Sequence, residues 1–393
     1  MAQAENVRVA VIDPLSGSFA PLGENQLRSW EYMAEMANKN KWAGEHTLEF
    51  VGFDNKAGVQ DSLTALKRAI DQGYRYIAQA NSSGVALALV DAVDKHNARN
   101  PGKEIVYFNH GAVDPELTNA KCSFWHFSFD SNADMKMQAL VNHLSRDQSI
   151  KNVYVIGQDY AFGRSVSKSA KEMLGKQRPD IKIVGDELHP IGMVKDFAPY
   201  VAKIKAAGAD TVITGNWGAD LSLLIKAARD AGLEANFYTY YAVLKGAPTA
   251  MGDSGLERVK YVGVWNANND GFVGKDIVDD FQQRYKDDFT WMQSHSVVTM
   301  LAKAIKESGS ADPVKVAYAL EDMSATSLNG DIRMRKDDHQ LQQPLFIGTW
   351  SKLDGKAVQI EQEGTGFGWR TEAVIPAADA SLPTSCQMKR PAR

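Results

Sequence analysis

The sequence predicts an α/β protein built from two doubly wound parallel-sheet lobes that follow one another along the chain. Strand and helix patterns alternate almost throughout the 393 residues. The strands are continuous apolar runs, which is typical of parallel strands covered on both faces by helices. The alternation restarts after residues 124–127, and the chain is long for a single core, which favours two domains or one elaborated domain.

The first set opens with an apolar strand at residues 7–12, followed by turn-rich residues and a helix from about Glu24. Leu27, Trp30 and Ala34 share one face of that helix because they recur at helical spacing. The other expected elements of this set are strands at 48–53, 76–80 and 105–109, and helices at 59–71 and from Gly84.

The second set repeats this pattern and leads into a more helical stretch. Its expected strands lie at 152–157, 181–185, 211–214, 237–241 and 259–265, and its expected helices near 134–144, 161–174, 197–206 and 219–231. Helices near 277–285, 294–306 and 313–320, a strand at 344–350 and a Gly-rich tail follow. With no long Pro- or Ser-rich linker between the sets, we expect strand crossings to join them around a cleft, a usual place for a small ligand.

Composition excludes several classes of protein. The net charge is −4, and the charged residues are interspersed along the chain rather than grouped in a basic stripe. A nucleic-acid partner is therefore not expected. The longest apolar stretches, such as residues 85–93, are too short to cross a bilayer. Ala2-Gln3-Ala4 before the first strand resembles the stub around a signal-peptidase site, with Met1 added for expression, although an ordinary terminus fits these residues equally well.

The sequence contains two cysteines, Cys122 and Cys386, far apart in the chain. Neither belongs to a C-x-x-C pair, so metal binding by them is not expected. In an exported protein an even number favours one disulfide, which would tie the tail back to the region after residue 113. The alternative is two buried, unpaired thiols.

Two strand ends look like binding loops. The first runs through residues 77–84 into a helix that begins with small residues, so the N–H groups of Ser83, Gly84 and Val85 point outward and suit a small anion. The second, residues 105–113, lies one βαβ step further on and opens beside the first at the carboxyl edge of the sheet. Neither loop pairs a nucleophile with a base, which indicates binding rather than catalysis.

Four segments, in order and spacing, resemble the periplasmic branched-chain amino-acid-binding proteins, the type I solute-binding components of ABC importers. They are DPLSGSFAPLG at 13–23, SSG at 82–84, GAVDPELT at 111–118 and YAFG at 160–163. The resemblance, from about residue 7 to 350, implies two lobes joined by three crossovers near 122–129, 251–259 and 328–338. The implied N-terminal lobe is 1–124 and 256–333, the C-terminal lobe is 125–255 and 334–375, and 376–393 is a tail packing on the first lobe or the hinge.

The resemblance also implies the ligand-binding residues. It carries the family's carboxylate site onto Ser83, Gly84, Gly111, Ala112 and Val113, with Leu22 from the first motif beside it. A hydroxyl side chain often stands in the family where this chain has Val113, so here only the main chain of that residue could serve. The second lobe would contribute Phe162 and Trp217 as aromatic lids, although an aromatic residue at a strand end is also a common core residue.

Tyr241 departs from the family pattern. Amino-acid binders of this family place an acid there for the ligand's ammonium, because a buried cation without a partner is unfavourable. Either Asp220 takes that role or the ligand has no ammonium group. Aromatic and keto carboxylates are ligands that lack an ammonium group. Asp220 also has a simpler interpretation, since an acid in a first helical turn complements the helix dipole.

Other polar residues give weaker signals. His110 lies between the two loops and could donate to a ligand, or it could be hydrogen-bonded structure. Residues 337–339 (Asp-Asp-His) alternate in direction on an extended segment, so we expect a solvated hinge or a surface patch rather than a metal site. We expect no metal and no cofactor, and the sequence contains no H-E-x-x-H, Walker or G-x-S-x-G motif.

Together these observations predict a periplasmic, monomeric solute-binding protein that is not an enzyme. A small carboxylate, either an amino acid or an aromatic acid, would dock on the first lobe. The second lobe would then close over it, and an ABC permease in the inner membrane would receive it. A ligand-sensing regulatory module of the same fold is the alternative.

Overall fold

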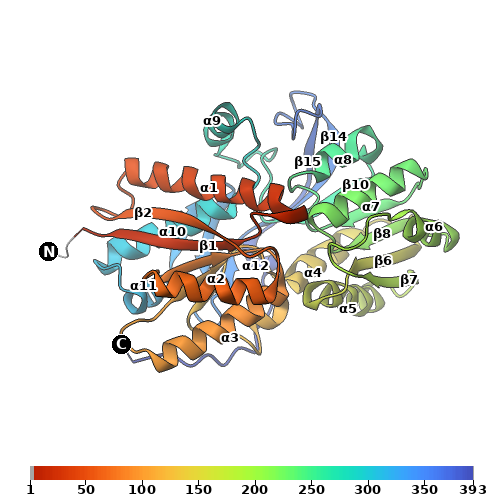
Figure 1. The fold of residues 1–393 in the computed structure, drawn as a ribbon. Helices are drawn as coiled ribbons and strands as arrows, with labels where there is room; N and C mark the ends of the chain where they lie inside the picture. The colour runs from red at the N-terminus through yellow and green to blue at the C-terminus, as the bar shows by residue number, and fades with distance from the viewer. Residues whose placement is uncertain (1–3, 393) are drawn as a thin grey trace. The chain divides into compact units, whose positions relative to one another are not determined.

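The computed structural model describes residues 4–392, so most of the Ala2-Gln3-Ala4 stub lies outside the described residues. The chain forms two compact units (Figure 1). Unit 1 holds the chain up to Asn132, Trp291–Gln343 and the chain from Pro383 onward. Unit 2 holds Ala133–Thr290 and Pro344–Leu382. The predicted fold class is confirmed.

The sheet of unit 1 is parallel and has the order β2-β1-β3-β4-β5. Its strands are β1 (Asn6–Asp13), β2 (Thr47–Asp54), β3 (Tyr76–Gln79), β4 (Val106–Asn109) and β5 (His126–Ser128). The four residues of β3 and of β4 are all buried, as expected for strands covered on both faces.

Helices cover both faces of this sheet (Figure 1). α1 (Ala20–Lys39) packs with α10 (Gln293–Ser308), and α2 (Val59–Asp71) packs with α3 (Ser83–Arg99) on the other side. α11 (Pro313–Leu320) follows α10, and an antiparallel sheet of β11 (Ser324–Ser327), β12 (Gly330–Met334) and β13 (Leu341–Gln342) completes this segment. The 3-10 helices of unit 1 are η1 (Gly17–Phe19) and η2 (Pro115–Thr118).

α1 begins at Ala20, earlier than the predicted start near Glu24. Pro21 stands in its first turn, where the missing N–H would have no helical partner and the fixed φ suits a helix. The sequence interpretation assigned this proline to the preceding turn, which explains the late start.

The sheet of unit 2 has the order β15-β14-β10-β9-β8-β6-β7. Its strands are β6 (Asn152–Gln158), β7 (Lys182–His189), β8 (Thr211–Thr214), β9 (Asn236–Thr239), β10 (Val259–Gly263), β14 (Leu345–Lys352) and β15 (Phe367–Ile375). Its helices are α4 (Ala133–Leu144), α5 (Ala161–Gln177), α6 (Ala198–Ala206), α7 (Gly218–Asp230), α8 (Ala247–Met251), η3 (Gly252–Gly255), α9 (Lys275–Tyr285) and α12 (Ala377–Ala380). α4 packs with α5, and α7 packs with α6 and α8 on the opposite face (Figure 1).

One edge of this sheet is antiparallel. β14 pairs antiparallel with β10 and with β15, and Trp350 lies opposite Trp369. The sequence predicted β14 but missed β15, because an edge strand with several half-exposed positions has no continuous apolar run.

The chain passes between the units after Asn132, Thr290, Gln343 and Leu382. The expected lobe boundaries need correction, above all the second crossing near 251–259. β10 pairs in parallel with β9 and antiparallel with β14, so residues 256–290 belong to unit 2. β5 keeps residues 125–132 in unit 1 because it pairs with β4, and β13 keeps 334–343 there because it pairs with β12.

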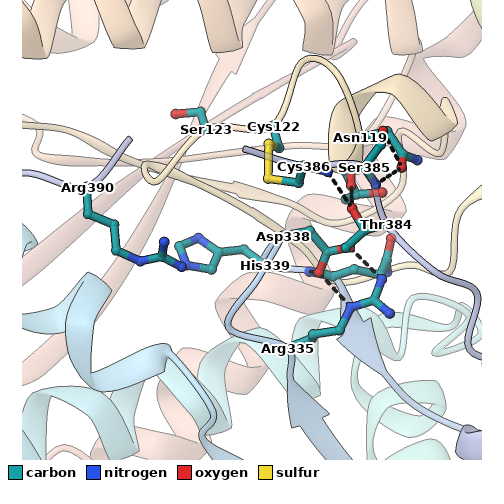
Figure 2. Close-up of a disulfide and its surroundings, with 12 residues drawn as sticks. Asn119, Cys122, Ser123, Arg335, Asp338, His339, Thr384, Ser385, Cys386 and Arg390 are labelled. Atoms are coloured by element: carbon teal, nitrogen blue, oxygen red, sulfur yellow. Dashed lines mark hydrogen bonds and ion pairs between the residues drawn. A yellow bond between two sulfur atoms is a disulfide. The ribbon is translucent and has the colours of Figure 1, made fainter. Parts of the chain in front are cut away.

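Of the expected tail, residues up to Leu382 belong to unit 2, whereas the chain from Pro383 onward lies on unit 1 and is fixed there covalently (Figure 2). Cys122 and Cys386 form a disulfide with a Cα–Cα distance of 5.8 Å, so the predicted pairing is confirmed. Beside it, the hydroxyl of Thr384 donates to the main-chain oxygen of Thr118 at 2.7 Å, and the main-chain N–H of Ser385 donates to Asn119 Oδ1 at 2.9 Å.

Residues 337–339 were expected to be a solvated patch, and this is wrong for two of the three. Asp338 and His339 are buried. Asp338 pairs with Arg335 (Figure 2), and His339 pairs with Glu321 at 3.3 Å, which also accepts from Arg390 of the tail at 2.7 Å. Among residues 4–392, no cluster of three or more His, Cys, Asp or Glu is suited to a metal ion.

Candidate functional site

The first candidate element is the start of α3 at the carboxyl edge of the unit 1 sheet. Ser82, with φ of 82°, turns the chain from β3 into the helix. The N–H of Ala86 bonds the oxygen of Ser82 at 3.1 Å. Within the described part of the chain, the N–H groups of Ser83, Gly84 and Val85 have no protein acceptor. They are the donors that the sequence predicted for an anion.

The hydroxyl of Ser83 links the two predicted loops. It accepts the main-chain N–H of Asp114 at 3.2 Å, which leaves its own hydrogen to donate. Asp114 in turn caps η2 by accepting the N–H of Glu116 at 2.9 Å. The sequence analysis placed these loops side by side because βαβ crossovers are right-handed. The bond from Asp114 to Ser83 shows that the two loops are in contact.

The second loop differs from the prediction. Asn109 Oδ1 accepts the N–H groups of Gly111 at 3.2 Å and of Ala112 at 2.8 Å, and Asn109 Nδ2 donates to the oxygen of Ala112 at 2.7 Å. These two amides are therefore satisfied by their own protein. The expectation that they converge on an anion is wrong for this state, and Val113, with 2 % of its surface exposed, stays a predicted contact only.

His110 is structural. Its ring is fully buried, Nε2 lies 3.1 Å from Asp13 Oδ2, and Nδ1 accepts from Trp291 Nε1 at 2.5 Å. Because both ring nitrogens are engaged by the protein, the proposed donation from His110 to a ligand is wrong.

The remaining residues of unit 1 in the predicted site are tightly packed. A Cβ on Gly111 would lie 2.9 Å from both Ala80 and the ring of Trp291, so this position has no room for a side chain. A Cβ on Gly23 would lie 1.9 Å from the oxygen of Pro14, which explains the glycine that ends the 13–23 motif. Leu22 is buried in α1 beside it, and its contact with a ligand stays a prediction.

Unit 2 contains an aromatic cluster, which we define as Tyr160, Phe162, Trp217, Tyr240 and Tyr241. The ring centroid of Phe162 lies 5.5 Å from that of Tyr240 and 5.8 Å from that of Tyr241. Trp217 Nε1 donates to the hydroxyl of Tyr160 at 2.7 Å. Burial, and next the charge of Asp134, raise the pKa of Tyr240, so its hydroxyl keeps its proton and donates to the oxygen of Ala133 at 3.3 Å. The structure thus brings Phe162 and Tyr241 together and holds Trp217 through Tyr160.

Asp220 lies in the first turn of α7 and is buried. Its Oδ2 accepts from Gln158 Nε2 and from the main-chain N–H of Gly192, both at 2.8 Å. A ligand ammonium would have to compete with these donors. The arrangement favours the simpler interpretation, in which Asp220 fixes a loop and complements the helix dipole.

Sequence reasoning missed Lys136 of α4. This lysine is almost fully buried, and its Nζ lies 4.8 Å from the ring centroid of Tyr241, within cation–π range. Nothing in the local pattern distinguished it from an ordinary helix-surface lysine. Its ring contact, Tyr241, stands more than 100 positions later in the chain.

Comparisons with known proteins agree with this architecture. A family model described as "Periplasmic binding protein" matches residues 6–356. "Leu/Ile/Val-binding protein homolog 4" of Brucella abortus (strain 2308) is 31% identical over 99% of this chain and 94% of its own length.

Two solved structures are similar in fold. The "Leucine-, isoleucine-, valine-, threonine-, and alanine-binding protein" of Brucella ovis, in a closed conformation, has a TM-score of 0.85 and 30% identity, covering 99% of this chain and 100% of that chain. A solute-binding protein of an ABC transporter from R. palustris, in complex with 4-hydroxybenzoate, has a TM-score of 0.79 and 20% identity, covering 94% of this chain and 97% of that chain.

Proposed function

From the premise that the chain belongs to the periplasmic binding protein family, we propose that it captures a small carboxylate for an ABC importer. The observation that carries the proposal is the row of main-chain donors at the start of α3, together with the Ser83 hydroxyl. Hydrogen bonds from N–H groups to an ionised acceptor are about twice as strong as neutral ones, and the helix dipole adds to them.

The aromatic cluster of unit 2 supplies the second set of proposed contacts. Rings of Phe162, Trp217 and Tyr241 would contact the apolar body of the ligand. Phe162 packs edge-to-face with Tyr160 and with Tyr241, which stiffens this surface. Lys136 lies beside Tyr241 at cation–π distance. Tyr241 stands where amino-acid binders of this family place an acid for the ligand's ammonium, so we propose an aromatic carboxylate ahead of a branched-chain amino acid.

Three further points of the proposal rest on the family. The protein would act in the periplasm, as a monomer, and would deliver its ligand to a permease in the inner membrane. No helix of the described residues has both the length and the apolar character needed to cross a membrane. The relatives named above are binding proteins, and we propose binding without turnover for this chain.

A thermal-shift screen tests the ligand, because a compound that binds only the folded protein raises its melting temperature. The panel holds 4-hydroxybenzoate, benzoate, phenylpyruvate, L-leucine and L-valine. Each acid is matched with its amide, for example 4-hydroxybenzamide, which keeps the body and removes the charge. We expect stabilisation by aromatic acids and none by the amides.

Two outcomes would change the proposal in different ways. Stabilisation by L-leucine alone would overturn the ammonium-free ligand and keep the carboxylate site. Equal stabilisation by acids and amides would overturn the carboxylate site itself. Isothermal titration of the best compound, with its concentration measured before and after incubation, checks that binding occurs without conversion.

A further inference from the structure

Asp13, His110 and Trp291 form a continuous hydrogen-bonded line in unit 1. Asp13 ends β1, His110 directly follows β4, and Trp291 precedes α10. His110 Nε2 lies 3.1 Å from Asp13 Oδ2, and Trp291 Nε1 lies 2.5 Å from His110 Nδ1. The carboxylate and the imidazole are fully buried, so water does not compete for these bonds.

The direction of this line follows from the chemistry of its members. An indole N–H only donates, so Nδ1 of His110 must accept. The hydrogen of the imidazole is then on Nε2 and is donated to Asp13. Trp291 therefore fixes the tautomer that allows His110 to bond the carboxylate.

The same carboxylate also holds the other loop. Asp13 Oδ1 accepts the main-chain N–H groups of Ala80 at 3.1 Å and Asn81 at 2.9 Å, and also accepts Asn81 Nδ2 at 2.9 Å. Asn81 directly precedes Ser82-Ser83, where α3 begins. One buried side chain thus fixes both chain segments that flank the proposed carboxylate site.

Trp291 acts on the second loop in a further way. Its ring atoms Cζ2 and Cη2 lie 2.9 Å from the position that a Cβ on Gly111 would take. The ring therefore sets how far the loop after His110 extends. Trp291 is also the first residue of unit 1 after the chain leaves unit 2.

We propose that Asp13 and Trp291 are positioning residues for the carboxylate site, acting through His110. They hold the start of α3 and the loop after β4 at a fixed separation before a ligand arrives. A site ordered in advance loses less conformational freedom on binding, so its affinity is higher. The binding part of this inference rests on the proposed function, and the ordering part does not.

Asp13→Asn tests the carboxylate in the free protein. The oxygen of the new asparagine could still accept the N–H groups of Ala80 and Asn81. The NH2 group of that asparagine would then face the Nε2–H of His110, so two donors would meet with no acceptor between them. Hydrogen exchange read by mass spectrometry should therefore quicken about tenfold or more in residues 109–113, where Asp13 makes no direct bond to the main chain. The indole N–H signal of Trp291 in a ¹⁵N spectrum should move as well, because the imidazole that accepts from it loses its bond to Asp13.

Trp291→Phe is the second variant, and it serves if Asp13→Asn does not fold. Phenylalanine removes the donor to His110 and also the indole atoms Cζ2 and Cη2 that lie against Gly111. Faster exchange is expected in residues 109–113, with residues 80–81 unchanged because their bonds to Asp13 Oδ1 remain.

Asn97→Ala is the matched control. Asn97 is buried in the same unit and makes two bonds to the main chain of Ile105: it donates to the oxygen at 2.9 Å and accepts the N–H at 2.8 Å. Neither bond involves residues 80–84 or 109–113. This variant should lose stability without faster exchange in 109–113. If it quickens exchange there as much as Asp13→Asn does, or if Asp13→Asn and Trp291→Phe leave that segment as in wild type, the inference is wrong.

Affinity provides the second readout, with 4-hydroxybenzoate and L-leucine as probes. We expect the affinity of the probe that binds to fall about tenfold in Asp13→Asn and about threefold in Trp291→Phe. Unchanged affinity beside faster exchange would overturn the positioning role. If neither probe binds wild-type protein, the proposed function fails with these ligands, while the exchange data still decide whether Asp13 and Trp291 order the loops.

Discussion

The candidate residues of unit 1 and unit 2 are held in place by different forces. In unit 1, directional hydrogen bonds fix the main chain, as when Asp13 accepts from Ala80 and Asn81. In unit 2, ring packing fixes side chains, as in the contact of Phe162 with Tyr241. Hydrogen bonds demand one geometry, whereas ring contacts tolerate several. The difference fits the proposal that unit 1 recognises a charge common to many ligands and that unit 2 discriminates their bodies.

The largest expected effect separates the stabilities of the two units. Replacing both Cys122 and Cys386 by serine removes a crosslink between two segments of unit 1 that are 264 residues apart in the chain. The free energy of opening of unit 1 should fall by about 2–5 kcal/mol, because the unfolded chain gains freedom. Hydrogen exchange on peptides from each unit measures this, with β6 and β8 as internal controls. An equal loss in both units would remove the distinction.

The next effect concerns the loss of folding stability at acid pH. Burial, and next the charge of His339, lower the pKa of His126 to about 3 from 6.5, and burial lowers that of His295 to about 4. Between these values and 6.5 the unfolded chain binds more protons, so stability is present above pH 6.5 and falls as the pH falls. The slope is about 1.4 kcal/mol per pH unit for each histidine.

His126→Phe should remove one histidine's share of that slope. Phenylalanine keeps a ring near Tyr107, whose centroid lies 5.1 Å from that of His126. Denaturant unfolding of wild type and variant at pH 5.0 and 7.5 measures the change. If the free energy of unfolding falls by the same amount from pH 7.5 to pH 5.0 in both proteins, His126 does not take up a proton on unfolding, and the prediction is wrong.

A third prediction tests the charge-recognising role of unit 1. Ser83→Ala removes a hydroxyl donor, so affinity should fall about tenfold, or ~1.4 kcal/mol, by a similar factor for every carboxylate that binds. Ser308→Ala is the matched control, since its hydroxyl donates to the oxygen of Ile305 at 3.3 Å in the last turn of α10, outside the proposed site. Titration calorimetry measures both. A loss that depends strongly on the body of the ligand would contradict the division of roles.

The smallest effect concerns the discriminating role of unit 2. Trp217→Phe keeps an aromatic ring and removes the bond from Nε1 to the hydroxyl of Tyr160. We expect affinity to change by about 0.5–1.5 kcal/mol, and by different amounts for 4-hydroxybenzoate and benzoate. The ratio of the two dissociation constants is the measurement, and a constant ratio would argue against discrimination by unit 2.

Local pattern was enough to predict most helices and strands. α2, β8 and α11 begin and end at the predicted residues, because apolar spacing and capping residues act over a few positions. The sheet that a strand joins is decided by partners far away in the chain. For this reason β10 was assigned to the wrong unit and β15 was missed.

The candidate site divides in the same way. The open donors at the start of α3 follow from a strand, a small-residue turn and a helix, all adjacent in sequence. The partner of His110 is Trp291, 181 residues away, and the partner of Lys136 is Tyr241. No local signal announces such contacts, so the sequence left the role of His110 open and passed over Lys136.

The disulfide has a consequence for how the molecule matures. Cys386 follows β15 and α12, so its thiol emerges only after the strands and helices of both units have been synthesised. Until then Cys122 is a thiol without its disulfide partner, which oxidants can oxidise and other disulfides can convert to a mixed disulfide. Formation of this disulfide is therefore a late step. In a cell that lacks a thiol oxidase acting on this protein, the last segment of the chain would not be linked covalently to Cys122.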